Sequence, residues 1–571
     1  MSKVTRRQAL KLASSASLML MGGATLGACS APPTMKSQTP DVVSTNAKSS
    51  TFVPDLEIDL QAVQDEVPIL SGSKTQVWRY SAQVVKGAAN SVIALPDNYL
   101  GPIIKTRIGQ KIRVNFTNEL PEGQPTIVHW HGLVLPEDMD GHPRYAIAPG
   151  GTYMYEFEMK NRAGTYWFHP HPHELTPLQV NNGLAGLFLV SNEEESSAGL
   201  PSGEQDIPLI IQDRTFDANN QFVYNVSMGD MGSMTNQNSM GNGMGGMMGS
   251  SDGGMMGTQG TQNMMSSFMG FLGERILVNG KSDFTLPVAT RAYRLRLLNG
   301  SNSRLYKLAW SDGTPMTVIA TDGGLLERPV TRSFVMLAPG ERVELWVDFS
   351  GRKVGDEFGL NSLAFESGET MMGGGGMDTM GMVSGNAPAL GASMPILTVR
   401  VITQVSETLK LPTQLSRVNR INIADAVNAT SPRQFRLTLN GMQWLINGRT
   451  FEMDAVASDE VVKLGTAEVW EFINEINPGQ MMDPNGMPHP FHIHGVQFNV
   501  IERRVLPDLK RLWNDVRDGY VDDGWKDTLL LMPSEKVKVL MRFTNTGTFI
   551  FHCHNLEHES QGMMRNYQVR A

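Results

Sequence analysis

The sequence predicts an all-β protein built from three β-sandwich domains, and three observations support this prediction. Short runs in which apolar and polar residues alternate recur along the chain, for example at 110–116, 152–157 and 467–472. Glycine and proline separate these runs, as is typical of turns between short strands. No long stretch shows the 3.6-residue period of an amphipathic helix, and 571 residues are enough for three domains that each bury a core.

The strand-like runs fall into three groups, which define the expected domains. The first domain is expected over 51–195 and ends at a polar linker, 192–203. The second is expected over 204–403. The third is expected over 404–571, and its first part, 404–432, leads into the domain core. Each group has the size of one sandwich domain.

The first 50 residues are expected to target the protein rather than to belong to its fold. A pair of arginines precedes a moderately apolar run, 12–26, which is too short and too rich in Ser and Gly to span a membrane. This pattern predicts a twin-arginine signal in residues 1–29, which exports folded proteins to the periplasm; an ordinary secretory signal is the alternative. Cys29 ends a lipobox-like sequence, so it either carries a lipid anchor or stands by chance near a cleavage site. Residues 30–50 are expected to form a flexible tether.

The composition argues against one class of binding partner and shows an unusual abundance of methionine. A formal net charge of −9 argues against nucleic acid as a partner. The expected second domain contains two inserts, 227–270 with twelve methionines and 370–394 with further methionines. Glycine-rich, weakly apolar segments cannot bury enough surface to offset their ordering entropy, so the simplest interpretation is two mobile loops. The alternative is that their thioether sulfurs, which are soft ligands, capture Cu(I).

The histidines are the most informative residues in the chain. All twelve fall in four short clusters. The clusters are His129, His131 and His142; His169, His171 and His173; His489, His492 and His494; and His552, His554 and His558. Because scattered core or surface histidines would not gather in this way, the sequence predicts that the clusters converge on one multinuclear metal site.

Each cluster contains a His-X-His pair, and this spacing has a structural meaning. The pairs are 129/131, 169/171, 492/494 and 552/554. Residues i and i+2 of a strand point to the same face, so both imidazoles of a pair can reach one metal ion or two neighbouring ions. The middle residue of the last pair, Cys553, points to the opposite face. It can therefore bind a further ion while its two neighbours bind the others.

The residues around Cys553 predict a mononuclear copper site. His558 and Met563 follow the cysteine, and His489 is the obvious source of a second imidazole, which completes a His₂Cys site with a weak axial methionine. Zinc would usually require more cysteines, and non-haem iron would require a carboxylate ligand. An electron that reaches a copper ion on Cys553 would need only the neighbouring backbone to reach the histidine cluster. His142 and His173 are expected to be surface residues or neighbours of ligands.

The motifs His-Trp-His-Gly at 129–132, Trp-Phe-His-Pro-His at 167–171, His-Pro-Phe-His-Ile-His-Gly at 489–495 and the His-Cys-His motif at 552–563 resemble the four copper motifs of the multicopper oxidases. This resemblance covers nearly all of the mature chain. Further segments resemble the bacterial branch with the cuprous oxidases of copper efflux, spore-coat laccases and bilirubin oxidases: 206–213, 295–300 and 524–528. The resemblance implies three cupredoxin-like Greek-key domains.

The resemblance also implies four copper ions per chain and a role for each ligand. The type 1 ligands would be His489, Cys553, His558 and Met563. The type 2 ligands would be His129 and His492. The ligands of the type 3 pair would be His131, His169, His171, His494, His552 and His554. Asp140 and Glu559 match acids that deliver protons during oxygen reduction; the alternative for each is a solvated loop carboxylate.

Two departures from the family pattern concern the substrate. The cuprous oxidases carry a methionine-rich insert in the third domain that covers the type 1 site, whereas both inserts here fall in the expected second domain. Met487 matches a methionine of the substrate-copper site. Asn485 stands where that site has an acid, and Asp483 lies nearby.

Together these features predict a periplasmic oxidase that couples one-electron oxidation of Cu(I) to four-electron reduction of dioxygen to water, in the service of copper tolerance. Phenols are expected as a second substrate class, through an exposed His489. A monomer is expected. The alternatives are a laccase-like phenol oxidase and a non-catalytic protein that sequesters copper with its methionine-rich loops.

Overall fold

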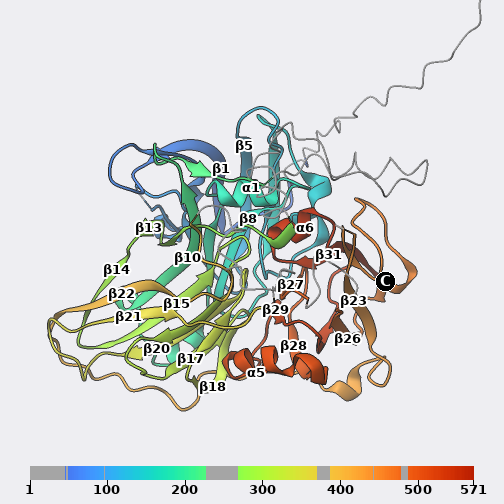
Figure 1. The fold of residues 1–571 in the computed structure, drawn as a ribbon. Helices are drawn as coiled ribbons and strands as arrows, with labels where there is room; N and C mark the ends of the chain where they lie inside the picture. The colour runs from blue at the N-terminus through green and yellow to red at the C-terminus, as the bar shows by residue number, and fades with distance from the viewer. Residues whose placement is uncertain are drawn as a thin grey trace, which may run out of the picture. The chain divides into compact units, whose positions relative to one another are not determined.

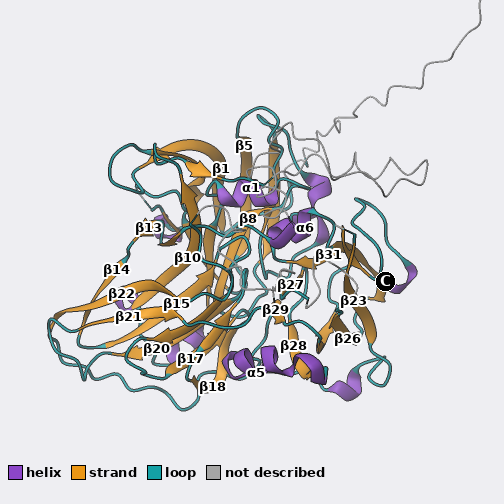
Figure 2. Ribbon diagram, in the orientation of Figure 1, coloured by secondary structure: helices purple, strands orange, loops and turns teal. Residues whose placement is uncertain are grey.

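The computed structural model describes residue 46 and the ranges 49–95, 97–226, 268–368, 386–441, 443–476 and 486–571. Strands dominate these ranges, and the longest α-helix within them, α5 (Lys510–Val516), has 7 residues (Figure 2). The all-β class is therefore confirmed. The predicted export signal with Cys29, nearly all of the tether, and most of both methionine-rich inserts lie outside the described residues.

The first β-sandwich pairs a four-stranded sheet with a five-stranded sheet. The first sheet has the order β2 (Thr75–Lys86), β1 (Leu56–Val67), β5 (Lys111–Glu119), β7 (Thr152–Glu158). The second has the order β3 (Val92–Ile93), β4 (Ile103–Arg107), β9 (Gly186–Ser191), β8 (Gly164–Pro170), β6 (Val128–His129). The pairs β1–β5 and β4–β9 are parallel, so each needs a long crossover connection rather than a hairpin.

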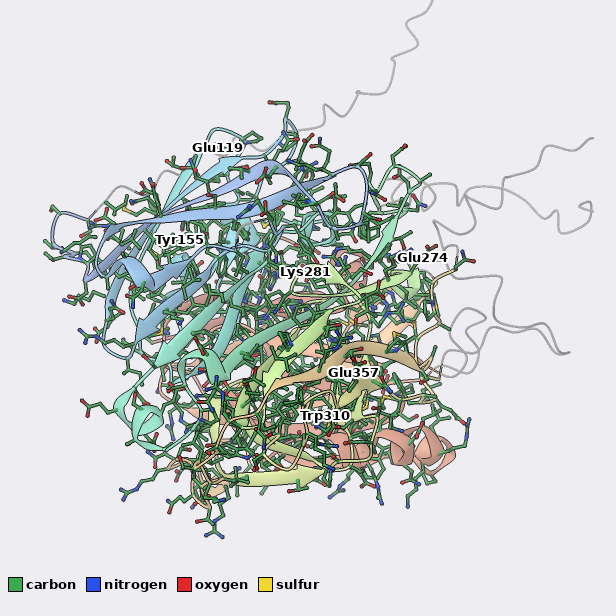
Figure 3. All side chains as sticks on the ribbon, turned by 90° about the vertical axis from the view of Figure 1, so that its left-hand side faces the viewer. Glu119, Tyr155, Glu274, Lys281, Trp310 and Glu357 are labelled. Carbon is green, nitrogen blue, oxygen red and sulfur yellow. The ribbon has the colours of Figure 1, made fainter. Side chains whose placement is uncertain are left out.

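The second sandwich is the largest of the three. One sheet has the order β13 (Lys281–Ser282), β12 (Arg275–Val278), β10 (Asp206–Phe216), β15 (Ala292–Asn299), β20 (Arg342–Asp348), β17 (Met316–Thr321), β18 (Gly324–Arg332), with β11 (Phe222–Val223) beside β10. The other has the order β14 (Thr285–Ala289), β22 (Met394–Thr403), β21 (Glu357–Ser362), β16 (Tyr306–Trp310), β19 (Val335–Leu337). In the side view of Figure 3 the exposed side chains of Glu119, Lys281 and Glu357 mark strands of the first two sandwiches.

The third sandwich consists of two five-stranded sheets. The first has the order β24 (Gln443–Ile446), β23 (Arg433–Asn440), β26 (Ala467–Asn474), β30 (Glu535–Arg542), β28 (Phe498–Val505). The second has the order β25 (Val461–Lys463), β32 (Met564–Arg570), β31 (Gly547–Cys553), β27 (His489–Ile493), β29 (Thr528–Leu531). Three pairs of sheets match the predicted number of sandwiches, while the exact domain boundaries stay a prediction.

The cores follow from the alternation seen in the sequence. In β7 the inward positions are Tyr153, Tyr155 and Phe157, and all three are buried between exposed or half-buried neighbours. Burying one such aromatic side chain stabilises the fold by about 1.5–3 kcal/mol. The core of the third sandwich also contains Cys553 and Met563, so these two side chains are held by packing on every side.

Two pairs of neighbouring strands each bring together histidines from two His-X-His motifs. In the first sandwich, β6 pairs with β8 and places His129 opposite His169. In the third, β27 pairs with β31 and places His492 opposite His552. The short helices α1 (Thr176–Asn181) and α6 (Leu556–Ser560) follow these strands and lie side by side (Figure 1). Within the described ranges, no helix combines the length and the apolar character needed to span a membrane.

Candidate metal centre

All twelve predicted copper ligands are buried, each with at most 1% of its surface exposed. Five groups of side chains bring potential metal-binding atoms within 4.8 Å of one another, and one of them adds Asp140 to His129 and His494. The other four contain only predicted ligands and together include all of these ligands except Met563. Three of the groups contain only histidines and join the first sandwich to the third. The fourth contains Cys553.

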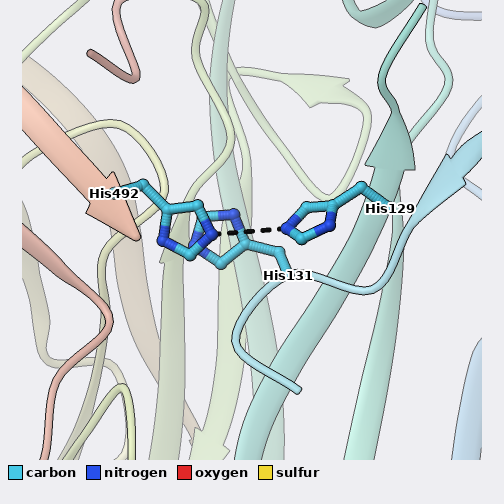
Figure 4. Close-up of side chains that lie close together, drawn as sticks. All are labelled: His129, His131 and His492. Carbon is cyan, nitrogen blue, oxygen red and sulfur yellow. Dashed lines mark hydrogen bonds between the residues drawn. The ribbon is translucent and has the colours of Figure 1, made fainter. Parts of the chain in front are cut away.

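The first group is centred on His129 and His492. Their Nε2 atoms face each other at 3.3 Å, with His131 beside them (Figure 4). The Nδ1 of His129 lies 2.7 Å from the carbonyl oxygen of Asp140, and the Nδ1 of His492 lies 2.8 Å from that of Asp527. A carbonyl only accepts, so each Nδ1 donates and each Nε2 keeps a lone pair. This is the orientation that outer hydrogen bonds give to metal-binding histidines.

The second group contains His131, His169 and His554. The Nδ1 of His131 lies 3.4 Å from the Nε2 of His169, whose own Nδ1 donates to the carbonyl of Pro170 at 2.9 Å. Neither ring nitrogen of His554 has a hydrogen-bond partner in the described part of the chain. A buried polar atom without a partner is costly, and a metal ion would supply the missing partner.

The third group contains His171, His494 and His552. The Nε2 of His552 lies 3.4 Å from that of His171 and 3.1 Å from that of His494. The outer Nδ1 of His552 donates to the carbonyl of Cys553 at 3.0 Å, and the outer Nδ1 of His494 lies 2.7 Å from the Asp140 carboxylate. The inner nitrogens therefore face one point.

The fourth group, which we term the cysteine group, contains His489, Cys553 and His558. The Cys553 Sγ lies 3.5 Å from the Nδ1 of His489 and 3.7 Å from the Nδ1 of His558. Met563 is held next to them through its backbone, whose N–H donates to the His558 carbonyl and whose carbonyl accepts from the Cys553 N–H, both at 3.0 Å. This donor set is that of a mononuclear blue-copper site.

Burial changes the pKa values of the ligand side chains and keeps the histidines in the neutral form that binds a metal ion. Desolvation lowers the pKa of both His489 and His169 to about 3, and it lowers the pKa of His129 and His554 well below the usual range. The rings are therefore neutral, which is the form that binds a metal. Burial also raises the pKa of the Cys553 thiol, so metal binding must displace its proton.

Three consecutive residues reach three different groups. Cys553 belongs to the cysteine group, His552 to the third group and His554 to the second. Neighbouring side chains on a strand point to opposite faces, and β31 ends at Cys553. The predicted junction at 552–554 is thus present in the structure.

Both predicted acids lie against the histidines. Asp140 is 1% exposed, and burial, aided by Glu137, raises the pKa of its carboxyl well above the usual range. Glu559 is 3% exposed, with one carboxylate oxygen 3.1 Å from the Nδ1 of His552 and the other 3.7 Å from the Nε2 of His171. This burial does not fit the alternative in which the two acids are solvated loop carboxylates.

The remaining predicted residues have simpler positions. Met487 is buried in the core of the third sandwich, and its substrate-copper role stays a prediction. Asp483 and Asn485 lie outside the described residues. His142 is buried, with its Nε2 2.9 Å from Asn566, and the half-buried His173 packs beside a phenylalanine ring. Neither histidine belongs to any of the four groups.

The expectation that His489 is exposed is wrong. The ring of Trp444 lies 5.0 Å from His489 and 4.4 Å from His558, centroid to centroid, and covers both. Phe268 in turn stacks on Trp444 at 5.1 Å and 18°, and its carbonyl accepts from the indole N–H at 3.3 Å. Phe268 is the described end of the first insert. That insert is therefore not confined to the second sandwich, because its end contacts the third.

Four important residues were missed by the sequence analysis. Trp444 and Phe268 carry no spacing signal, since they lie 176 positions apart in the chain. Asp527 lies in 524–528, a segment noted only for its resemblance, and touches His131. Arg342 forms an ion pair with Asp527. An arginine inside a strand gives no sign of its partner until the sandwiches are packed.

The fold and the grouped ligands define a multidomain β-sandwich metalloprotein with one thiolate group and a histidine cluster. The multicopper oxidase family models match residues 76–195 and 426–571. The chain is 31% identical to a multicopper oxidase of Staphylococcus aureus over 85% of each chain, and 30% identical to a laccase of Bacillus stratosphericus over 87% of this chain and 91% of the laccase. It is similar to the crystal structure of the McoA multicopper oxidase of Aquifex aeolicus, with a TM-score of 0.69 and 30% identity over 91% and 97% of the two chains.

The chain belongs to the multicopper oxidase family. It is therefore an oxidoreductase with copper cofactors that uses dioxygen and a reducing substrate. Its sandwiches are the cupredoxin-like domains of that family.

Proposed function

We propose that this multicopper oxidase is exported to the periplasm and oxidises Cu(I) to Cu(II), with phenols as a second substrate class, while it reduces dioxygen to water. Its role would be copper tolerance. The observation that carries the proposal is the position of residues 552–554, where one thiol and two imidazoles in sequence reach three ligand groups. A protein that only stores copper has no need for this linkage.

The ligand groups support a full set of four copper ions. The cysteine group with Met563 would hold the type 1 ion, and His129 and His492 would hold the type 2 ion. The second and third groups would hold the type 3 pair; these two groups and the type 2 ligands are termed the three-ion centre. Copper bound in this way supplies one-electron chemistry at the cysteine group and dioxygen reduction at the three-ion centre.

The protein itself provides the electron-transfer path between the copper sites and the side chains that deliver protons. Cys553 is bonded through its backbone to His552 on one side and His554 on the other, so the two sites share one short covalent connection. We assign proton delivery to Asp140 and Glu559, because each is buried against ligand histidines of the three-ion centre. Asp140 has the raised pKa that suits a proton donor near neutral pH.

Both described ends of the first insert contact the cysteine group's surroundings, which favours Cu(I) as the substrate. Before the insert, the Tyr224 hydroxyl donates to Glu557 in α6 at 2.8 Å. At the end of the insert, the Met269 carbonyl accepts from the side chain of Asn555, the residue that caps α6, at 3.2 Å. Because α6 also carries His558, a methionine-rich segment is attached at both ends beside the site that accepts electrons. Thioether sulfur is a preferred ligand of Cu(I).

The burial of His489 also favours a small reductant. Trp444 and Phe268 separate the imidazole from solvent, so a bulky phenol cannot touch it in this conformation. The laccase-like alternative would require this cover to move. Phenols therefore remain the second substrate class.

Copper counting combined with oxygen uptake tests the proposal. The copper-loaded protein is expected to contain four copper ions per chain and to consume oxygen when Cu(I) is added. Bound copper without oxygen uptake would support sequestration instead. Shortening the segment 227–267 is expected to lower the rate of Cu(I) oxidation more than the rate of phenol oxidation. An equal loss of both activities would show that the insert is not part of the Cu(I) site.

Location is tested separately. Replacing the paired arginines 6 and 7 by lysines is expected to keep the protein in the cytoplasm, as the twin-arginine route requires. Cys29→Ser then decides the anchor: release from the membrane fraction supports acylation, and no change argues for a simple cleavage site.

A further inference from the structure

Beside the three-ion centre, residues 341–342 of the second sandwich form ion pairs with residues 526–527 of the third. Lys526, in the third sandwich, places its Nζ 3.0 Å from Glu341 and 3.2 Å from Asp322 of the second. The next residue, Asp527, forms an ion pair with Arg342, the residue that follows Glu341. All five residues are at most 6% exposed. A buried charge persists only when it is paired and hydrogen-bonded, so this contact is highly specified.

Arg342 uses every donor that an arginine has. Its Nη1 and Nη2 donate in parallel to the two Asp527 oxygens at 2.7 and 2.6 Å. Its Nε donates to the carbonyl of Thr165 in the first sandwich at 3.0 Å, and the remaining two N–H groups donate to the carbonyls of Gly340 and Asp322 at 2.9 and 3.0 Å. Five donors thus meet five acceptors in three sandwiches. The forked contact fixes the plane of the Asp527 carboxylate as well as its charge.

Because Asp527 is held in place by Arg342, its own hydrogen bonds fix the orientation of two ligand histidines. Its Oδ1 lies 3.2 Å from the Nε2 of His131 and accepts from the hydroxyl of Thr528 at 3.0 Å. Its backbone carbonyl accepts from the Nδ1 of His492 at 2.8 Å. Asp527 therefore touches one ligand with its side chain and another with its backbone.

His131 is oriented differently from its neighbours. Six ligand histidines of the three-ion centre, His129, His169, His171, His492, His494 and His552, turn their Nε2 atoms toward another ligand histidine. His131 instead turns its Nδ1 inward, 3.4 Å from the Nε2 of His169, and its Nε2 outward to Asp527. The Thr528 hydroxyl also lies 3.0 Å from this Nε2, but it donates its own hydrogen to Asp527. A carboxylate only accepts, so Nε2 carries a hydrogen and Nδ1 keeps the lone pair.

We infer that Arg342 is a positioning residue of the three-ion centre, which acts through Asp527 to select the His131 tautomer that binds metal through Nδ1. The described strands of the second sandwich contain none of the twelve predicted copper ligands, but by this route the sandwich sets the geometry of a centre built from the other two. The inference rests on the proposed three-ion centre and adds to it a residue that never touches metal.

Arg342→Gln tests the inference, with the cysteine group as an internal reference in the same molecule. Loss of an outer partner typically weakens metal binding by about 10- to 100-fold. We expect a loss of this size in copper affinity at the three-ion centre, measured by competition with a chelator, together with an altered electron paramagnetic resonance signal of the type 2 ion. The blue colour of the cysteine group should be kept. Unchanged affinity and an unchanged signal would overturn the inference, and so would an equal loss of blue colour.

Arg113→Gln is the matched control. Arg113 is also buried and pairs with Glu57 and Glu156, but none of its hydrogen bonds to described residues reaches a histidine. This variant is expected to lower the melting temperature and to leave the copper signals unchanged. Arg342→Lys separates charge from geometry, since lysine cannot form the fork. We expect it to resemble Arg342→Gln, and full recovery by lysine would contradict the positioning role.

A double substitution keeps the test valid if Arg342→Gln alone is too unstable. Asp527→Asn combined with Arg342→Gln removes both buried charges at once. If Arg342 acts through Asp527, the double variant should bind copper no more weakly than Asp527→Asn alone, whereas additive losses would contradict the inference. The proposed function fails differently: wild-type protein would then lack the blue colour or the four copper ions.

Discussion

The Asp140 carboxylate lies 2.7 Å from the Nδ1 of His494, so an acid of the first sandwich is hydrogen-bonded to a ligand histidine of the third. The other carboxylate oxygen has no hydrogen-bond partner in the described part of the chain and lies 3.9 Å from the Nδ1 of His129. Asp140 thus contacts histidines of two groups and retains a free acceptor position.

Asp140→Asn should separate proton delivery from metal binding. Asparagine keeps the shape and one acceptor oxygen but cannot give up a proton. We expect oxygen reduction to fall by about 100-fold or more, as for the loss of a general acid, while the copper content and the blue colour stay near wild type. Turnover of the variant at the wild-type rate would show that Asp140 does not deliver protons during oxygen reduction. Asp138→Asn, the same change at an exposed neighbour, is the control.

Gly340→Ala should disturb the second histidine group directly. The loop before β20 has φ +83 at Gly340, and an added Cβ would meet the rings of His131 and His554 at 3.0 Å. We expect the copper pair to lose occupancy while the cysteine group keeps its colour. Gly313→Ala is the control, because Gly313 has φ +76 with open space around it and so reports the backbone strain alone. Equal effects of the two changes would show that contact with the histidines is irrelevant.

Phe268→Ala should open the cysteine group to larger substrates. Without the Phe268 ring, Trp444 loses its stacking partner and His489 gains a path to solvent. We expect kcat/KM for phenols to rise several-fold relative to that for Cu(I), at a stability cost of about 3 kcal/mol, typical of a buried phenylalanine. Phe222→Ala, near the other end of the insert, is the control. A fall in phenol oxidation would show that the cover does not limit access.

The copper-free protein should lose stability in mild acid. Histidine has an ordinary pKa of 6.5, whereas burial lowers the pKa of His489 and His169 to about 3 in the folded state. Below pH 6.5 these two imidazoles bind protons in the unfolded chain but stay neutral in the folded chain. The free energy of unfolding therefore falls as the pH decreases toward 3. Carboxyls with ordinary pKa values titrate near pH 4, so the decline between pH 6.5 and 5 comes from the histidines. The raised pKa of the buried Asp140 carboxyl acts in the opposite direction, because the folded chain binds that proton more tightly than the unfolded chain.

Melting temperatures from pH 8 to 5 measure this effect. Little change is expected from these histidines above pH 7, and a decline is expected below 6.5. Copper should shift the decline to lower pH because it competes with protons for the same nitrogens. A melting temperature that is constant from pH 6.5 to 5 without copper would contradict the pKa shifts.

Residue spacing was sufficient to predict the class of fold and the pairs of ligands. A strand has a period of two, so His-X-His at 552–554 fixed two imidazoles on one side and Cys553 on the other before any tertiary structure was known. The resemblance supplied the assignment of ligands to individual ions, and the four groups of side chains are compatible with it.

The rest depends on contacts between sandwiches, which local patterns do not encode. His489 looked exposed because nothing in its own segment covers it; Trp444 and Phe268 come from elsewhere in the chain. The Arg342–Asp527 pair joins residues 185 positions apart. The choice of Nδ1 at His131 follows from that pair and leaves no trace in the sequence.

Cys553→Ser tests the central claim, that one residue joins the two copper sites. The serine hydroxyl does not replace thiolate as a copper ligand, while His552 in β31 and His554 directly after it keep their backbone positions. The account predicts loss of the blue colour and of oxygen uptake, with copper still bound by the eight paired histidines. Turnover that persists without the thiol, or loss of copper from the histidine groups as well, would contradict it.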